Sequence, residues 1–441
     1  MEWLQEDIAE KWRTEGKRYA SEINVYVNKG MTEGWDSVGE EPAEDDRSAL
    51  ANKIFKMIRA ANERNEIAAL RALIPAATWP LAKHFEKEMQ AIRSIHFLGQ
   101  DEVVFSTGTS WEENKVITVK NDNVSVFNEY SFVGASPDKQ FYALSSKKGI
   151  KIIKSMDCQL QGELIAQFSW TELNTQIQAL SSEISILGEI EPHEELPLEE
   201  AIPFQEGKAL LLVTGHGIFY VQLAQQMKVT MLHPDLAELK KYDLDQADID
   251  MAHGAVSSDG RWIAFGSQSS DHLLYDVVTE QTYNFYPNSS YPHYSIFTKD
   301  QQHIWYNACH FYNGDTIAVS LEQVVAGEMN KDQEWPSMNE DARVYAAVAL
   351  EQGIVIGDAY GYLKLIDTQG QEIWRHFVGS TISALTVDNE EKTLAVGTYG
   401  GMLHFLALHA SERSEYEIGT GAVREIKRIL AWKNQDKPLW W

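Results

Sequence analysis

A repeated unit of about 40 residues is the feature of this sequence that most constrains its fold. A polar turn followed directly by a short apolar strand recurs along most of the 441-residue chain. The clearest copies are SPDKQFYAL (136–144), SSDGRWIAF (257–265), TKDQQHIWY (298–306) and DNEEKTLAV (388–396). Weaker copies cover 98–106, 205–214 and 350–358. A period of this length indicates a repeat architecture in which each unit is one small supersecondary element.

Seven units of this kind predict a closed ring of small antiparallel sheets. The equivalent turn positions are Gly99, Asp138, Glu206, Asp259, Asp300, Leu350 and Glu390. One such sheet cannot bury both of its faces, whereas packing the sheets around an axis buries them. A β-sandwich or two unrelated β domains would also contain many short strands, but neither predicts seven similar units. We therefore predict a mainly β fold, a β-propeller of about seven blades over residues 91–433, with six or eight blades as the alternatives.

A second strand follows each unit and carries a resemblance to a known family. Its clearest examples are HLLYDV (272–277), YLKLID (362–367) and MLHFLA (402–407). In WD40 repeats the corresponding strand ends in Trp-Asp, and Tyr275-Asp276 and Ile366-Asp367 resemble degenerate forms of that ending. The Gly-His dipeptide of the family is missing from its expected places. The chain thus resembles a degenerate WD40-like β-propeller of the standalone bacterial type, which implies a function in protein binding.

The sequence outside the repeats divides into a helical N-terminal segment (1–90) and a C-terminal tail (434–441). Apolar residues recur at helical spacing from Leu50 onward, and residues 3–19 also read as a helix. The glycine-containing stretch 28–41 predicts a loop between them. Two segments could close the ring, the run 424–432 and the run 23–27. The residues alone do not decide between these two.

An insertion interrupts the repeat between the second and third units. Asp138 and Glu206 are 68 residues apart, which leaves an excess at about 165–201. Within it, 170–184 predicts a short helix, and the acidic, proline-interrupted stretch that follows predicts an exposed loop. Because loops on a rigid scaffold often carry function, the insertion is a candidate binding element. A surface excursion without a function explains it equally well.

Charge and cysteine content restrict the partners and the compartment. The formal net charge is −27, from 65 acidic and 38 basic residues, which argues against nucleic acid and anionic membranes as partners. A basic protein partner would be attracted. Two cysteines, Cys158 and Cys309, give no disulfide framework. The N-terminal residues lack the apolar core of a signal peptide, and no stretch has the length of a membrane span. We therefore expect a cytoplasmic protein.

No catalytic constellation emerges, so we predict neither an enzyme nor a cofactor or metal site. The sequence has no GxSxG, HExxH or phosphate-binding loop. His253, His293 and His303 enter neighbouring units and could converge on the axis, but structural roles explain them as well. The candidate partner-binding residues combine acidic side chains of the insertion with aromatic side chains in turns. They are Glu194, Glu195, Glu199, Glu200, Tyr291, Tyr294 and Trp335.

These observations leave functions of different classes open. The main hypothesis is a non-enzymatic protein–protein interaction module. Its most specific form is an immunity protein that binds and occludes a basic toxin domain, because complementary charge accelerates association. The resemblance to standalone bacterial WD40-like proteins implies this form. The alternatives are a scaffold subunit of a larger assembly and an enzyme or ligand-binding propeller that uses the central channel.

Overall fold

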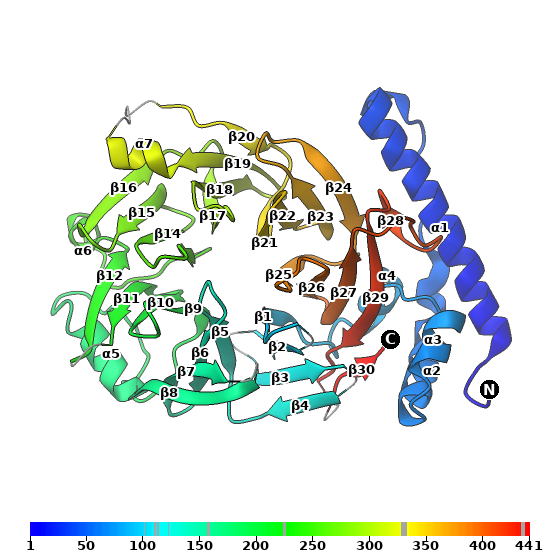
Figure 1. The fold of residues 1–441 in the computed structure, drawn as a ribbon, viewed down its shortest axis with the longest axis horizontal. Helices are drawn as coiled ribbons and strands as arrows, with labels where there is room; N and C mark the ends of the chain where they lie inside the picture. The colour runs from blue at the N-terminus through cyan, green and yellow to red at the C-terminus, as the bar shows by residue number, and fades with distance from the viewer. Residues whose placement is uncertain are drawn as a thin grey trace.

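The computed structural model is a ring of small sheets with helices attached at one side (Figure 1). It describes residues 1–100, 102–109, 112, 114–121, 123–156, 159–223, 226–327, 333–433 and 437–441. Within these residues the strands form seven antiparallel sheets. Five of them are built from consecutive strands alone, whereas β28, which follows β27 in the chain, joins the sixth sheet beside β24. The predicted seven-bladed, mainly β propeller with a helical N-terminal segment is therefore confirmed.

The first three blades each contain four strands. Blade 1 consists of β1 (Ile92–Phe97), β2 (Glu102–Thr107), β3 (Lys115–Lys120) and β4 (Asn123–Phe127). Blade 2 consists of β5 (Phe132–Ala135), β6 (Phe141–Ser146), β7 (Gly149–Met156) and β8 (Gln159–Ser169). Blade 3 consists of β9 (Leu198–Phe204), β10 (Ala209–Thr214), β11 (Gly217–Gln222) and β12 (Lys228–His233).

Four further blades complete the ring, and the last two have a fifth strand. Blade 4 consists of β13 (His253–Val256), β14 (Trp262–Gly266), β15 (His272–Asp276) and β16 (Gln281–Phe285). Blade 5 consists of β17 (Tyr291–Phe297), β18 (His303–His310), β19 (Asn313–Ser320) and β20 (Ser337–Asn339). Blade 6 consists of β21 (Val344–Leu350), β22 (Gly353–Asp358), β23 (Tyr362–Ile366), β24 (Glu372–Phe377) and β28 (Ile418–Gly419). Blade 7 consists of β25 (Ile382–Val387), β26 (Thr393–Thr398), β27 (Met402–Leu408), β29 (Val423–Leu430) and β30 (Leu439–Trp440).

The repeated polar turns connect the first and second strands of the blades. In the turn between β17 and β18, the Thr298 hydroxyl donates to an Asp300 oxygen at 2.7 Å, and the same Asp300 oxygen accepts from the Gln302 amide at 3.0 Å. Ser257 and Asp259 make the same contact in blade 4. Such side-chain bonds to local backbone favour turns over helix or strand. The seven turns predicted as equivalent therefore mark the same corner of every blade.

Apolar clusters hold each blade against the next. Phe265 of blade 4 packs in one cluster with Tyr220 of blade 3, and the other neighbouring pairs have clusters of their own. Between blades 7 and 1, Leu403 and Ala395 pack with Phe105. The alternating inner and outer faces of the strands thus become sheet-to-sheet interfaces, as in other radial repeats.

The ring closes next to the last blade. The run 424–432, one of the two predicted closing segments, forms β29 of blade 7, whereas 23–27 lie in the helix α1. Directly after β29, the Ala431 carbonyl accepts from the Gln90 amide at 3.1 Å, and the Lys433 amide donates to the Glu88 carbonyl at 2.8 Å. The chain that leads into blade 1 is thereby bonded to the chain that leaves blade 7.

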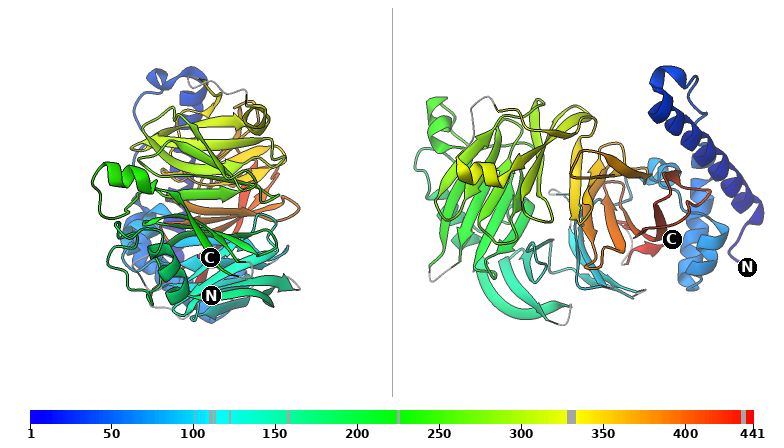
Figure 2. Two further views of the ribbon diagram at one scale, coloured as in Figure 1. Left: turned by 90° about the vertical axis from the view of Figure 1, so that its left-hand side faces the viewer. Right: turned by 45° about the horizontal axis from the view of Figure 1, so that its top comes forward.

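The N-terminal helices pack outside the ring against blade 7 (Figures 1 and 2). They are α1 (Glu6–Glu33), α2 (Ala51–Glu63), α3 (Ile67–Leu73) and α4 (Trp79–Phe85), with short turns η1 (Trp35–Ser37) and η2 (Asp46–Leu50). The loop predicted over 28–41 is wrong in its first part, since α1 continues to Glu33. Gly30 lies inside the helix because the Trp35 ring packs against it. A Cβ at this position would lie only 2.5 Å from a ring carbon of Trp35, so only glycine leaves room for that ring.

In the described part of the chain, three short helices lie in connections between strands of the ring. The insertion contains α5 (Trp170–Gln178), which Ser169 and Glu172 cap reciprocally. Helices α6 (Leu236–Lys241) and α7 (Leu321–Ala326) follow blade 3 and β19. Trp170, Leu173 and Ile177 of α5 pack into the cluster shared by blades 2 and 3. Among the described residues, no helix combines the length and apolarity needed to cross a membrane.

Candidate functional site

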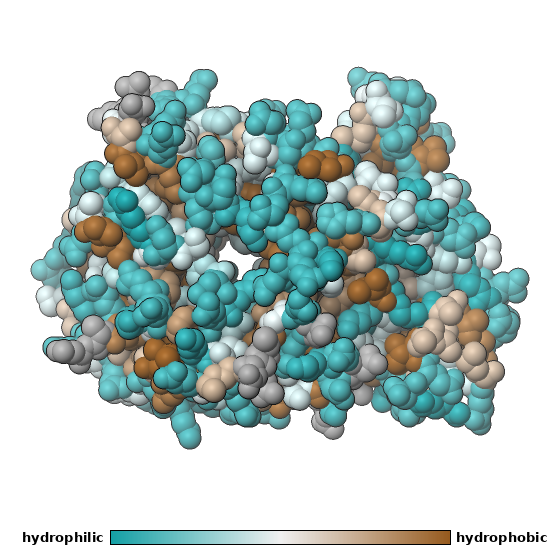
Figure 3. All heavy atoms as spheres, in the orientation of Figure 1, coloured by the Kyte–Doolittle hydropathy of each residue, from teal (hydrophilic) through white to brown (hydrophobic). Residues whose placement is uncertain are grey.

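One face of the ring collects two kinds of loop from every blade. Because the strands of a blade are antiparallel and run in sequence from the inside outward, the turn between strands 2 and 3 lies at the same end as the connection to the next blade. The inner strands also begin at this end. We call it the upper face. Loops from all blades meet there around the central opening seen in Figure 3.

Exposed aromatic side chains occupy the turns between strands 2 and 3 in three successive blades. Phe311 and Tyr312 lie in blade 5, Tyr360 in blade 6 and Tyr399 in blade 7, and we call these four residues the aromatic strip. Their side chains are 73%, 61%, 54% and 49% exposed. The rings of Tyr312 and Tyr360 lie 5.6 Å apart and so join two blades. Because each member extends from a tight turn of a rigid sheet, the strip needs little ordering before it meets a partner.

Arg343 supports the aromatic strip from below. Its guanidinium donates to the Phe311 carbonyl at 3.0 Å and lies 4.9 Å from the centre of the Tyr345 ring. Tyr345 in turn lies edge-on to Tyr399 at 5.7 Å. On its other side, Arg343 donates to His293 Nε2 at 3.3 Å. This arginine therefore connects the outer part of the strip to the wall of the central opening.

Acidic and phenolic groups line the opening next to the strip. Glu200, on the inner strand of blade 3, is half-buried; burial, followed by the charge of Glu199, raises its pKa to about 8, against the opposing charge of Arg93. Burial and the nearby Glu200 raise the pKa of Tyr294, whose hydroxyl accepts from the Ala347 amide at 3.1 Å. At neutral pH the Glu200 carboxyl and the Tyr294 hydroxyl are therefore both protonated.

Arg93 spans the mouth of the opening. It extends from the inner strand of blade 1 across the Phe132 ring of blade 2, 5.5 Å from the ring centre, to blade 3. There it donates to the Leu198 carbonyl and pairs with Glu199 at 3.1 Å. One side chain thereby connects three consecutive blades at the upper face.

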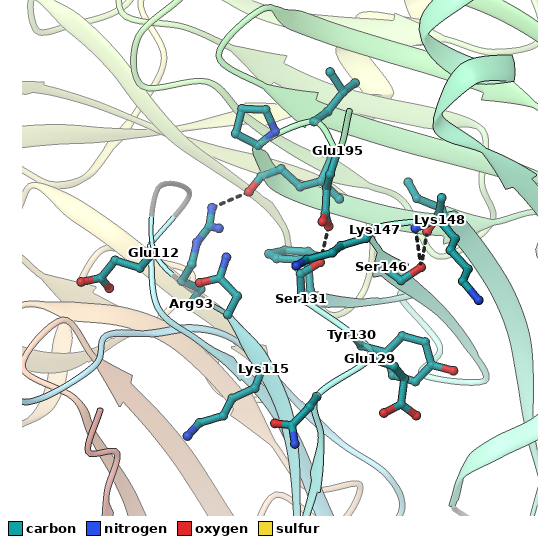
Figure 4. Close-up of a pocket in the computed structure, with 18 of the residues that line it drawn as sticks. Arg93, Glu112, Lys115, Glu129, Tyr130, Ser131, Ser146, Lys147, Lys148 and Glu195 are labelled. Carbon is teal, nitrogen blue, oxygen red and sulfur yellow. Dashed lines mark hydrogen bonds between the residues drawn. The ribbon is translucent and has the colours of Figure 1, made fainter. Parts of the chain in front are cut away.

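A cleft of about 1720 Å³ adjoins Arg93, between the upper ends of blades 1 and 2 and the end of the insertion (Figure 4). Its lining is rich in cations, in contrast to the chain as a whole. The cations are Arg93, Lys115, Lys147, Lys148, Lys151 and Lys433, and the carboxylates are Glu112, Glu129 and Glu195. Glu195 accepts hydrogen bonds from the hydroxyls of Ser131 and Ser145, the second at 2.7 Å. We call this region the basic cleft.

The structure separates the glutamates predicted to bind a partner. Glu194 is exposed and accepts from the Glu191 amide at 3.0 Å, whereas Glu195 lies in the basic cleft. Glu199 pairs with Arg93, and Glu200 lines the central opening. Three of the four therefore gather near the mouth of the opening, but they do not form one exposed acidic surface.

The predicted aromatic anchors also have different surroundings. Tyr291 begins β17 and stacks on His310 at 6.2 Å, beside the aromatic strip. Tyr294 lies in the wall of the opening. Trp335 is only 8% exposed, because it packs edge-on against Phe285 in the cluster between blades 4 and 5. Trp335 is therefore part of the core and not an exposed anchor.

The aromatic strip itself was missed in the sequence. A signal was present: the turns between strands 2 and 3 read AYG at 359–361 and TYG at 398–400, so a tyrosine stands before glycine at the same place in two neighbouring repeats. The same turn of blade 2 holds Lys147 and Lys148. Alignment of the repeats on their second turn therefore identifies both the tyrosines and the lysines.

The histidines that could have converged on the axis have separate contacts. His253 bonds to the Met251 carbonyl at 2.9 Å and His293 to the Val344 carbonyl at 2.6 Å, while His303 begins β18. Across the part of the chain that the structure describes, no three His, Cys, Asp or Glu side chains come together in a way that could hold a metal ion.

Comparison with solved structures adds a likeness in fold. No family model matches the sequence, and no curated protein is significantly similar to it. The β-propeller domain of Cps50 (Swd1) from Myceliophteria thermophila, known from a crystal structure, is similar with a TM-score of 0.48 and 10% sequence identity, over 69% of this chain and 92% of that one.

Proposed function

We propose that this protein is a non-catalytic interaction module that binds a protein partner on its upper face. The aromatic strip carries the proposal. Tyrosine and phenylalanine are enriched at the energetic centres of protein interfaces, where a few buried anchors supply most of the binding energy. All four side chains of the strip are exposed and extend from successive blades of a rigid ring, and the rings of Tyr312 and Tyr360 lie 5.6 Å apart. Covering these side chains would remove a large apolar area from water.

The narrower hypothesis of a cytoplasmic immunity protein for a basic toxin domain draws its support from the net charge of −27. The electrostatic field of a chain with this net charge would attract a basic domain and raise the rate of association. The contact would then depend on acidic residues other than Glu195 and Glu199, since the first lies among lysines and the second is already paired. Exposed carboxylates such as Glu194 are the available ones.

The proposal is tested by capturing partners with the purified chain and two matched variants. Tyr312→Ala with Tyr360→Ala removes the centre of the aromatic strip. Val278→Ala is the control, because Val278 is 74% exposed in the turn between strands 3 and 4 of blade 4, on the opposite face. We expect the double variant to bind a captured protein at least about 30-fold more weakly, as loss of about 2 kcal/mol at an anchor requires.

The control should bind that protein like the unaltered chain. Equal binding by all three forms would place the interface elsewhere and contradict the proposal. Thermal unfolding of each variant should be unchanged, since the substituted side chains are exposed. A toxin domain as the captured protein would support the narrower hypothesis, provided that its binding weakens with salt.

A further inference from the structure

We propose that the basic cleft binds an extended acidic segment of a partner protein, a run of aspartates or glutamates. This inference deepens the proposed function, because it assigns a partner chemistry to a second region of the same upper face. Its support is independent of the aromatic strip, which lies across blades 5 to 7, whereas the cleft lies over blades 1 and 2.

The charge balance of the cleft is the first argument. Among the described residues, six cations and three carboxylates line it, and Glu199, which pairs with Arg93, adds a fourth carboxylate, so the balance is 6 − 4 = +2 in a chain with a net charge of −27. Lys147 and Lys148 are exposed, and neither forms an ion pair with any described residue. Lys151 is half-buried, and its ammonium lies 4.6 Å from the centre of the Tyr130 ring. Positive charge is thus concentrated where the rest of the surface is acidic.

The size of the cleft is the second argument. Pockets for small molecules enclose about 300 to 1,000 Å³. At about 1720 Å³ the basic cleft exceeds that range and extends from the turn of blade 2 to Arg93 at the central opening. A segment of several residues fits a cleft of this volume, and its carboxylates could reach Lys147 and Lys148 at the turn of blade 2 (Figure 4).

The rim of the cleft favours a short acidic segment over a long polyanion. The insertion brings the exposed residues Glu189, Glu191 and Glu194 beside Ile190, which lines the cleft. Charges separated by more than about 8 Å are largely screened at physiological salt, so an acidic segment inside the cleft interacts mainly with its lining. A nucleic-acid strand that continued past the cleft would meet these glutamates and be repelled.

The experiment measures binding of a fluorescein-labelled octaglutamate peptide to the purified chain by fluorescence anisotropy. We compare Lys147→Glu with Lys148→Glu in one variant against Lys53→Glu with Lys56→Glu in another. Lys53 and Lys56 are exposed on α2, outside the cleft, so both variants change the net charge equally. We expect the cleft variant to bind at least about tenfold more weakly and the helix variant to bind like the unaltered chain, with binding lost as salt rises from about 50 to about 300 mM.

Three results would overturn the inference. They are no octaglutamate binding at low salt, equal weakening in both lysine variants, and tighter binding of an eight-nucleotide oligothymidylate than of octaglutamate. The test needs no natural partner, so its failure leaves the aromatic strip untouched. Conversely, Tyr312→Ala with Tyr360→Ala should not alter octaglutamate binding, which separates failure of the cleft from failure of the proposed function.

Discussion

The Nδ1 atom of His404 lies 2.8 Å from an Oε atom of Glu425, and this hydrogen bond joins neighbouring strands of blade 7. The same carboxylate accepts from Arg428 at 2.7 Å and from Arg71 of α3 at 3.3 Å. Burial acts to raise the pKa of Glu425, but the charge of Arg428 and the bond from His404 hold it well below its usual value. Arg428 also donates to Thr78 at 2.9 Å. Glu425 is therefore the centre of a buried polar network that ties the helices to the ring.

Replacing Glu425 by glutamine should destabilise the protein strongly. The substitution removes the negative charge that compensates Arg428 and Arg71, and breaking a buried ion pair on one side costs about 3 kcal/mol or more. Urea unfolding measures this loss. Glu390→Gln is the control, because Glu390 pairs with Lys392 on the surface and its loss should leave the transition unchanged. Equal transitions for both variants would show that the network contributes little to stability.

Buried neutral histidines should make the fold sensitive to mild acid. Burial lowers the pKa of His96, His233, His253 and His404 to about 4 in each case. The unfolded chain binds a proton near the ordinary histidine value of 6.5, so between that value and about 4 the unfolded state holds more protons. Stability is therefore lost as pH falls through this window, by about 1 kcal/mol per pH unit for each such histidine.

The measurement is the urea midpoint at a pH of about 7 and of about 5. We expect a clearly lower midpoint at the lower pH. His404→Gln should reduce the difference, since glutamine does not titrate in either state. A midpoint that stays constant across this window would mean that these histidines take up protons without unfolding.

Trp441 should be required for docking of the helices. Its side chain is fully buried, its indole donates to the Ile74 carbonyl at 2.8 Å, and its ring lies 6.1 Å from that of Trp12. Trp441→Ala should cost about 4 kcal/mol, as for other large buried aromatics. Hydrogen exchange in α2 should accelerate more than in blade 4. Trp79→Ala is the control, because Trp79 is 52% exposed. Unchanged exchange in α2 would contradict a docking role.

The ring could be predicted from the sequence because its determinants are local. Ser257 and Asp259 specify their turn by bonds within the turn, and the same chemistry recurs in other blades. The position of the insertion followed from one long interval between such turns. These signals do not depend on which residues the fold later brings together.

The upper face could not be predicted because it depends on contacts between distant segments. Tyr312 and Tyr360 are 48 residues apart by number (360 − 312) and meet only when blades 5 and 6 pack side by side. Arg93 reaches Glu199 across an intervening blade. The loop predicted over 28–41 was wrong for a related reason. Gly30 indicated a loop, but it is a glycine because the Trp35 ring, which comes after the end of α1, packs against it.

Gly134→Ala should prevent correct packing of blades 2 and 3. Gly134 lies on β5, and a Cβ there would come within 1.8 Å of the Ala201 carbonyl oxygen on β9. A backbone atom cannot move aside like a side-chain end, so we expect a loss of about 3 kcal/mol or more, or insoluble protein. Gly215→Ala is the matched control, because the nearest atom to its Cβ would be 3.8 Å away. Soluble Gly134→Ala protein with an unchanged urea midpoint would show that the two inner strands can separate without loss.

Glu200→Gln should stabilise the protein, and more so as pH rises. Burial and the charge of Glu199 raise the pKa of Glu200 from its ordinary value of 4.5 to about 8, so the folded state holds a proton that the unfolded state has released. Stability from this group is present below the lower value and is lost as pH rises through the window to the higher one. Glutamine resembles the protonated acid, so the variant lacks this loss.

The free energy of unfolding of Glu200→Gln should therefore equal that of the unaltered chain at a pH of about 4 and exceed it at a pH of about 8. Paired urea titrations at the two pH values give this difference directly, and the exposed Glu194→Gln provides a control without it. A gain of the same size at both pH values would mean that Glu200 is ionised in the folded protein, with water or Arg93 compensating its charge.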